Sequence, residues 1–439
     1  MLRNLLDRLL LPVLLVLLWA QAAADGAVEG WRAGAARVEI TPHPTMSNWV
    51  THKPYGKVLE PVFVRAVVLE QKSNQIACVS WDLLYALEGA VGKVRQRINR
   101  ETGIPESSIL VCATHNHSAP WAVMPEDSLT KTERQTLDSF LKDPLYPQWI
   151  EQLMESSAKA VRQAQAARRP ATLAIGRVFA GDLIFNRRPR KPDGAVQSLS
   201  TPADPYVLPA GLRFGPVDPT LTILALRDEK RLTIATLFHL PCHAVMIYPS
   251  YNGVSGDWPG AAALALRKEL GGEALFLQGC AGDIVPARRG RRAREQMVKV
   301  ITQRAVAAAK SAQVLSLTNN FRVGREFVAA PVTETVRRDT GREQFKAEVQ
   351  VITCGPLALV ALPGEPLIGL ALAIQERSPF PHTVVIGYAN GYGVQYVGLP
   401  GEKGRGGYES GPRNLGKDEC GQLMVDAAVR LLEEQKRGE

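Results

Sequence analysis

The chain has 439 residues, of which 46% are hydrophobic and 22% charged, a composition that excludes a disordered polypeptide and suits one large domain or two smaller ones. Part of its formal net charge of +9 comes from two arginine-rich runs, at residues 187–191 and 288–294. Such runs usually lie on a solvated surface, although contact with an anionic membrane surface is a second interpretation. Neither run has interleaved aromatic residues or a DNA-binding motif, so we do not expect a nucleic-acid partner.

The first 24 residues have the features of a secretory signal peptide. Arg3 and Arg8 precede an apolar core at residues 9–19, and the three alanines at residues 22–24 suit a cleavage site. The apolar core is too short to span a bilayer comfortably, so a retained anchor is the less favoured alternative. We therefore predict a secreted or periplasmic protein whose mature form begins close to Asp25.

The remaining residues, 25–439, alternate between strand-like and helix-like patterns without a Pro/Ser-rich linker, so we expect one domain. Asp228, Glu229 and Lys230 separate two strands as a hairpin turn would. This alternation predicts an α/β domain, a layered mixed β-sheet with flanking helices and some antiparallel pairing. Buried strands are predicted at residues 62–69, 76–80, 109–113, 221–226, 232–238, 274–277, 349–353, 357–362 and 383–386, and helices at 150–164, 367–374 and 417–436.

The most informative motif is Ala-Thr-His-Asn-His-Ser-Ala at residues 113–119, directly after an apolar run. A strand that ends in His-x-His can offer one imidazole to a metal and keep the other for a reacting group. His239 and His243 lie in a second loop. Taken alone, the motif fits a pair of hydrogen-bonded histidines at a strand end equally well.

Other polar residues also follow predicted strands. His115, His243, Glu365 and Tyr396 each come within about ten residues of a strand end, and loops at one end of a sheet are where α/β proteins gather ligands. From local sequence alone, Glu365 fits a first-turn carboxylate of the following helix equally well. Asp257 is better explained as a helix cap than as a ligand.

The six cysteines do not require a disulfide framework. Several lie in or beside strand-like runs, where a small buried thiol is equally at home. Cys242 and Cys280 lie near other polar residues and are alternative metal ligands, but no CxxC pair supports that role.

Several motifs, in the same order along the chain, resemble those of the neutral/alkaline non-lysosomal ceramidases, specifically their N-terminal catalytic domain and its shorter bacterial relatives. His243 lies fourteen residues before Asp257, and Tyr408 lies twelve residues after Tyr396; both intervals are similar to those of the family. The matching segments are residues 33–42 and 61–70, similar to the family's opening strands; 114–118, similar to Thr-His-Thr-His-Ser; 362–365, similar to Pro-Gly-Glu; and 390–396, similar to Asn-x-Tyr-x-x-Tyr.

The resemblance implies one zinc ion per chain and hydrolysis of an amide bond in ceramide or a related N-acylated lipid. Two imidazoles and a carboxylate are a common catalytic zinc set, and zinc can activate water and polarise a carbonyl. The resemblance also implies that Arg187 contacts the substrate. A surface role for Arg187 is an equally good interpretation. By resemblance the zinc ligands are His115, His243, Glu365 and Tyr396, with His117 and Tyr408 facing the substrate.

Two departures from the family limit this inference. Val285 stands where ceramidases carry a serine, and no counterpart of their C-terminal immunoglobulin-like domain follows Tyr408. We therefore expect a secreted zinc-dependent amidohydrolase that uses zinc-activated water. The alternatives are a non-catalytic zinc-containing binding protein of the same fold, and an esterase or other hydrolase with the same site.

Overall fold

The computed structural model describes residues 30–127, 129–317 and 321–438; the predicted signal peptide lies outside them. Three larger sheets and two small two-stranded sheets make up the β structure of these residues. The first sheet has the order β4-β3-β2-β1-β5, and β3 and β4 run parallel. Its strands are β1 (Trp31–Glu39), β2 (Phe63–Gln71), β3 (Asn74–Trp81), β4 (Ile109–Ala113) and β5 (Arg169–Pro170), covered by α2 (Glu88–Thr102) and α4 (Tyr146–Ala166).

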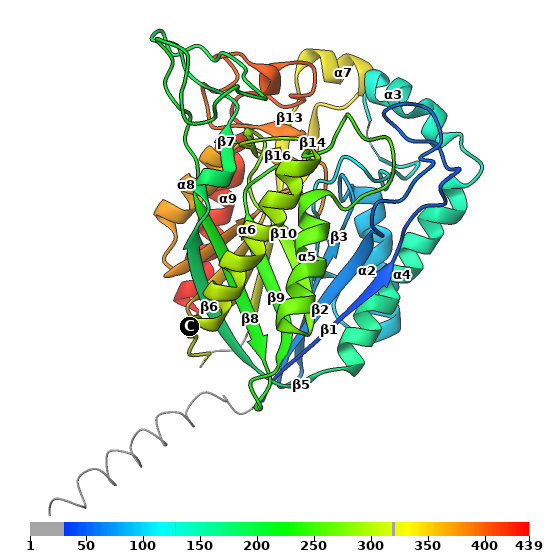
Figure 1. Ribbon diagram of the computed structural model, residues 1–439, viewed down its shortest axis with the longest axis vertical. Helices are drawn as coiled ribbons and strands as arrows, with labels where there is room; N and C mark the ends of the chain where they lie inside the picture. The colour runs from blue at the N-terminus through cyan, green and yellow to red at the C-terminus, as the bar shows by residue number, and fades with distance from the viewer. Residues whose placement is uncertain (1–29, 128, 318–320, 439) are drawn as a thin grey trace, which may run out of the picture.

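The second sheet has the order β10-β9-β8-β6-β12, and helices α5 and α6 cross its outer face (Figure 1). Gly176 in β6 allows a close approach, because a Cβ there would lie 2.2 Å from the Ala308 carbonyl oxygen of α6. The elements are β6 (Thr172–Phe179), β8 (Thr220–Arg227), β9 (Thr233–Leu240), β10 (Glu273–Gln278), β12 (Gln313–Val314), α5 (Asp257–Leu270) and α6 (Arg291–Lys310).

The third sheet has the order β13-β14-β15-β17, and α8 and α9 pack against it (Figure 1). Its elements are β13 (Arg322–Pro331), β14 (Gln344–Cys354), β15 (Leu357–Ala361), β17 (His382–Ile386), α8 (Ile368–Arg377) and α9 (Cys420–Arg437). The small sheets pair β7 (Ile184–Asn186) with β11 (Ile284–Pro286) and β16 (Glu365–Pro366) with β18 (Tyr396–Val397), and the shorter helices include α3 (Lys131–Leu141) and α7 (Glu334–Thr340).

The inner apolar faces of the three large sheets meet in one central cluster. The helices pack their apolar faces against the outer faces of the sheets. Val67 from the first sheet, Leu237 from the second and Leu359 from the third belong to this cluster. The α/β prediction is therefore confirmed, and all nine predicted strands are present, eight with shifted ends and β4 with the predicted ends. Within the described ranges, no helix combines the length and apolar character needed to cross a membrane.

Strands β6 and β13 were not predicted. In β13 the edge position leaves Phe327 half exposed, and charged residues interrupt the apolar pattern, so the segment lacks the signature of a buried strand. In β6, Gly176 breaks the apolar run. β6 is specified by pairing with β8, which is distant in sequence, and β13 by pairing with β14, the next strand along the chain.

Candidate metal centre

The centre lies where the loops after several strands interlock. The chain leaves β4 at Ala113, and the amide of Ala113 donates to the carbonyl of Tyr388, just beyond β17 (3.0 Å). Asn116 forms a bridge with Ala244, just after β9. These long-range contacts bring the His-x-His loop, the second histidine loop and the segment after β17 together, as the strand-end argument predicted.

His115, His243 and Glu365 converge on one point. Glu365 Oε2 lies 3.2 Å from His115 Nε2 and 3.3 Å from His243 Nε2. All three side chains are buried, at 0%, 1% and 1% exposure. His115 holds a left-handed backbone conformation (φ 59°), which is strained for a non-glycine residue and recurs at functional sites.

The hydrogen bonds of the two imidazoles leave their inward atoms as acceptors. His115 Nδ1 faces the carbonyl oxygen of Leu84 and His243 Nδ1 faces that of Ile284, both at 3.0 Å. A carbonyl only accepts, so each Nδ1 carries the proton and each Nε2 presents a lone pair. Glu365 Oε2 is buried and makes no hydrogen bond. Two imidazole lone pairs and a carboxylate oxygen therefore converge on one point, which fits a bound cation.

The charge states also suit a metal site. Burial, followed by the positive charge of Arg187, lowers the pKa of His243 to about 3, so this imidazole is neutral at pH 7. Burial opposes ionisation of Glu365, but the facing imidazoles hold its pKa well below its usual range. A deprotonated carboxylate beside neutral imidazole is the form that binds a divalent cation.

His117 approaches the same point differently. Its Nε2 lies 3.1 Å from His115 Nε2, and His115, His117 and His243 each offer a nitrogen within 4.8 Å of the others, so these residues form a cluster that can hold a metal ion. Unlike the other two rings, His117 has a buried Nδ1 without a hydrogen-bond partner. Its ring packs against Tyr248 (4.8 Å between centroids), and it is only partly buried.

Tyr85 was missed by the sequence analysis. Its hydroxyl donates to Glu365 Oε1, the oxygen that does not face the histidines, and it accepts from Gln395 Nε2 (3.2 Å). Such a contact orients a ligating carboxylate. Tyr388 was also missed; its ring stacks on His115 at 4.2 Å. The strand-end rule that found His115 also applies to Tyr85, which follows β3.

Tyr396 lies beside Glu365, because the two are paired residues of β16 and β18. Arg187 Nη2 donates to the Tyr396 hydroxyl (3.0 Å) and to the Gly282 carbonyl (2.7 Å). Burial, together with the charge of Glu365, raises the pKa of Tyr396 well above its usual value, so the phenol is neutral. Tyr408 is half exposed and its ring lies 5.8 Å from that of Tyr396.

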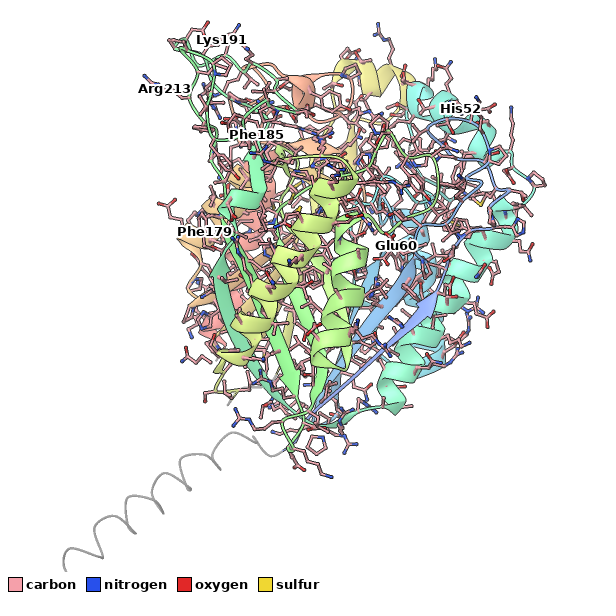
Figure 2. All side chains as sticks on the ribbon, viewed as in Figure 1. His52, Glu60, Phe179, Phe185, Lys191 and Arg213 are labelled. Atoms are coloured by element: carbon pink, nitrogen blue, oxygen red, sulfur yellow. The ribbon has the colours of Figure 1, made fainter. Side chains whose placement is uncertain are left out.

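The surface interpretation of the first arginine run is wrong for its first two residues. Arg187 and Arg188 are 6% and 2% exposed, and both bind Glu409, through Arg187 Nε (2.6 Å) and Arg188 Nη1 (2.8 Å). Lys191 is exposed and lies at the far end of a projecting segment (Figure 2). Burial opposes the charge of Arg187, but neighbouring Tyr396 and Glu409 keep its pKa above the usual value.

We expect Glu409→Ala to lower the free energy of unfolding by about 3–5 kcal/mol, because it leaves two buried guanidinium groups without their shared carboxylate. Urea unfolding monitored by circular dichroism measures this. Glu343→Ala removes an exposed partner of Arg337 and is the matched control, expected to leave the unfolding midpoint in place. Equal effects of the two substitutions would contradict the structural role of Glu409.

The remaining candidates lie outside the cluster. Asp257 is the first residue of α5, and its carboxylate accepts from the amides of Trp258 (2.6 Å), Met246 (3.2 Å) and Ile247 (3.3 Å), so it serves backbone amides, as a cap would. His239 Nε2 faces the Val385 carbonyl. All six cysteines are buried free thiols, and the histidine cluster found among the described residues contains none of them.

Val285 packs in a small apolar cluster with Phe185 and Ala287, so its side chain offers the centre no polar group. Ser255 Oγ is engaged with Glu60 (2.6 Å). Ser118 Oγ is buried without a partner.

The similarity of this chain to known proteins lies in its fold. No protein-family model and no curated protein sequence matches the chain. Among solved structures, it is similar to neutral ceramidase from Pseudomonas aeruginosa, with a TM-score of 0.73 and 18% identity, over 92% of this chain and 75% of the other. A structure of ceramidase complexed with C2 gives a TM-score of 0.71 and 18% identity, over 92% and 76%. The chain therefore has a ceramidase-like fold.

Proposed function

We propose that the protein is a zinc-dependent hydrolase that cleaves the amide bond of an N-acylated lipid, ceramide or a related compound. The observation that carries this proposal is the convergence of three acceptor atoms in a ceramidase-like fold. Glu365 Oε2 lies 3.2 Å from His115 Nε2 and 3.3 Å from His243 Nε2. Two nitrogens and one carboxylate oxygen match a catalytic zinc set with positions left open.

In this proposal the ligands of one zinc ion are His115, His243 and Glu365, with Tyr396 as a weak fourth. Bound zinc supplies an activated water and polarises the amide carbonyl. Carbonyl groups of Leu84 and Ile284 keep the two imidazoles oriented.

His117 stands beside the proposed ligands and is partly buried. Burial, with His115 and His243 nearby, lowers its pKa well below the usual value, so it is neutral and its ring carries one N–H. That N–H is positioned to donate to the developing oxyanion of an amide carbonyl. Tyr248 packs on His117 and Tyr408 lies beside Tyr396, and in this proposal both would contact substrate.

A cavity of about 330 Å³ adjoins the centre. Trp121 and Tyr392 line it and pack on Tyr85 at 4.8 Å each, so one side chain separates the cavity from Glu365. Leu137 and Val336 extend its apolar wall. A volume in this range with mixed lining is typical of small-molecule sites and suits part of the substrate.

We infer direct attack by water, because the apolar packing of Val285 leaves no hydroxyl where the family has its serine. Chelator-treated protein should lose all hydrolysis and regain it with zinc. Turnover in oxygen-18 water should place the label in the fatty acid without an acylated protein, as measured by mass spectrometry. An acyl group on Ser118 or Ser255 would contradict this mechanism.

The decisive experiment is to incubate the zinc-loaded protein with a panel of N-acyl amides and esters, with His115→Ala as the control. Hydrolysis of an amide by the wild-type protein, with none by the His115→Ala variant, supports the proposal. Protein that holds zinc but cleaves no amide or ester would instead identify a binding protein of this fold.

We also propose export, on the basis of residues 1–24, and contact with an anionic membrane surface through the exposed basic residues. N-terminal sequencing of exported protein should find a start within a few positions of Asp25. A membrane-embedded product that retains residues 9–19 would contradict cleavage.

A further inference from the structure

Two guanidinium groups near the metal centre have no protein partner. Among the described residues, the side chains of Arg289 and Arg413 make no hydrogen bond or ion pair, although both are partly buried, and the Arg289 Nε is fully buried. By contrast, the neighbouring Arg187 and Arg294 each pair with a glutamate. A desolvated cation without a partner is costly, so these two groups are placed for an anion that the chain does not supply.

Both cations act on the same side of the centre. The amide of Gly290 donates to the carbonyl of Met246 (2.7 Å), which places Arg289 beside the loop that carries Tyr248. Burial raises the pKa of Tyr248, and the charges of Arg413 and Arg289 both oppose that rise. The Tyr248 ring packs 4.8 Å from that of His117. Arg289 therefore lies on the Tyr248 side of His117, and Arg413 lies on the wall of the adjoining cavity.

Arg413 also faces the proposed ligands. Burial lowers its pKa, but Tyr85, Tyr408, Tyr392 and Glu365 together raise the pKa above the usual value. None of these groups forms a hydrogen bond to the guanidinium, so its donors remain free for a ligand.

The wall that carries Arg413 offers a second unmatched group. Arg413 and Gln395 both line the 330 Å³ cavity. Gln395 is 1% exposed and donates its Nε2 to Tyr85, while its Oε1 has no partner. A free acceptor and a free cation on one wall match a ligand that carries an N–H close to a negative charge.

The local charge balance points the same way. Glu365 is the one carboxylate in the proposed ligand set, and Glu409 is already shared by Arg187 and Arg188. A divalent cation at the centre adds further positive charge. The cavity wall sets Arg413 and Lys403 against Glu133 and Asp339, so the attraction for an anion would come from the unpaired guanidinium groups and the bound cation.

We propose that Arg289 and Arg413 bind an anionic group of the substrate, so that the preferred substrate is an N-acyl amide with a carboxylate or sulfonate close to the amide bond. Gln395 Oε1 accepts the amide N–H. This inference rests on the proposed function for the bond that is cleaved, and it narrows the substrate to charged conjugates in preference to amides with a neutral headgroup.

The test compares N-lauroylglycine with N-lauroylethanolamine, which share an acyl chain and differ in the carboxylate. We expect the wild-type kcat/KM to favour the glycine conjugate by about 10- to 100-fold, the range for hydrogen bonds to a charged group. Arg413→Gln and Arg289→Gln, tested separately, should each reduce this ratio by about 10-fold or more. Arg288→Gln removes an exposed neighbouring charge and should leave the ratio unchanged.

A binding measurement separates this inference from the proposed function. Isothermal titration calorimetry with zinc-loaded protein should show tighter binding of N-lauroylglycine or N-lauroyltaurine than of N-lauroylethanolamine, and the difference should shrink in Arg413→Gln. Tighter binding of the taurine conjugate would select the sulfonate. If binding depends on the arginines but no hydrolysis occurs, the proposed hydrolase function is refuted and the proposed anion site is supported. Equal binding and equal kcat/KM for charged and neutral amides would overturn the anion site, even if hydrolysis occurs.

Discussion

His115→Ala and His243→Ala should each abolish most zinc binding. An orienting partner of a ligand typically accounts for about 10- to 100-fold in metal affinity, and a direct ligand should account for more, so we expect a loss above about 100-fold. Each substitution also leaves Glu365 facing a single imidazole where two converge now. Elemental analysis after dialysis against a weak chelator gives the zinc content, which should be close to one per chain in the wild-type protein.

His239→Ala is the control, because His239 is also buried (5% exposed) and its Nε2 also faces a carbonyl, that of Val385, yet it lies outside the cluster. It tests whether loss of a buried imidazole alone perturbs metal content through the fold. Melting temperatures of the three variants should be compared without metal. Full zinc retention in the His115 and His243 variants, or an equal loss in the His239 variant, would refute the assigned centre.

His117→Ala should lower kcat by about 100- to 1,000-fold, the effect typical of removing one oxyanion donor, while zinc content stays near one per chain. The reason is structural: carbonyls orient His115 and His243 through Nδ1, whereas His117 Nδ1 has no such partner. Steady-state kinetics and elemental analysis of the same preparation measure both quantities.

The same variant distinguishes two arrangements of ligands. His117 belongs to a compact group of three imidazoles with His115 and His243. If His117→Ala loses zinc as completely as His115→Ala, then the three histidines hold the ion, and His117 is a ligand. If zinc remains and kcat is unchanged, His117 has no role in the reaction.

The sequence by itself determined the parts of this protein that depend on local pattern. The apolar run that forms β4 is followed directly by the His-x-His motif, so the sequence predicts a strand that ends in a ligand loop. The same holds for β15 and the Glu365 that follows it. Continuous apolar runs predict buried strands, and the ends of those strands indicate where ligands bind.

Only the tertiary structure decided which side chains meet. From local sequence, Glu365 fits a helix-end carboxylate and a metal ligand equally well. Its contacts with His115 and His243 favour the role of ligand. Charge along the chain does not reveal burial: Arg187 is buried against Glu409, 222 positions away, while the Arg413 side chain has no partner among the residues that the structure describes. Such pairings arise when distant loops interlock around strand ends, and a residue's neighbours in sequence carry no information about them.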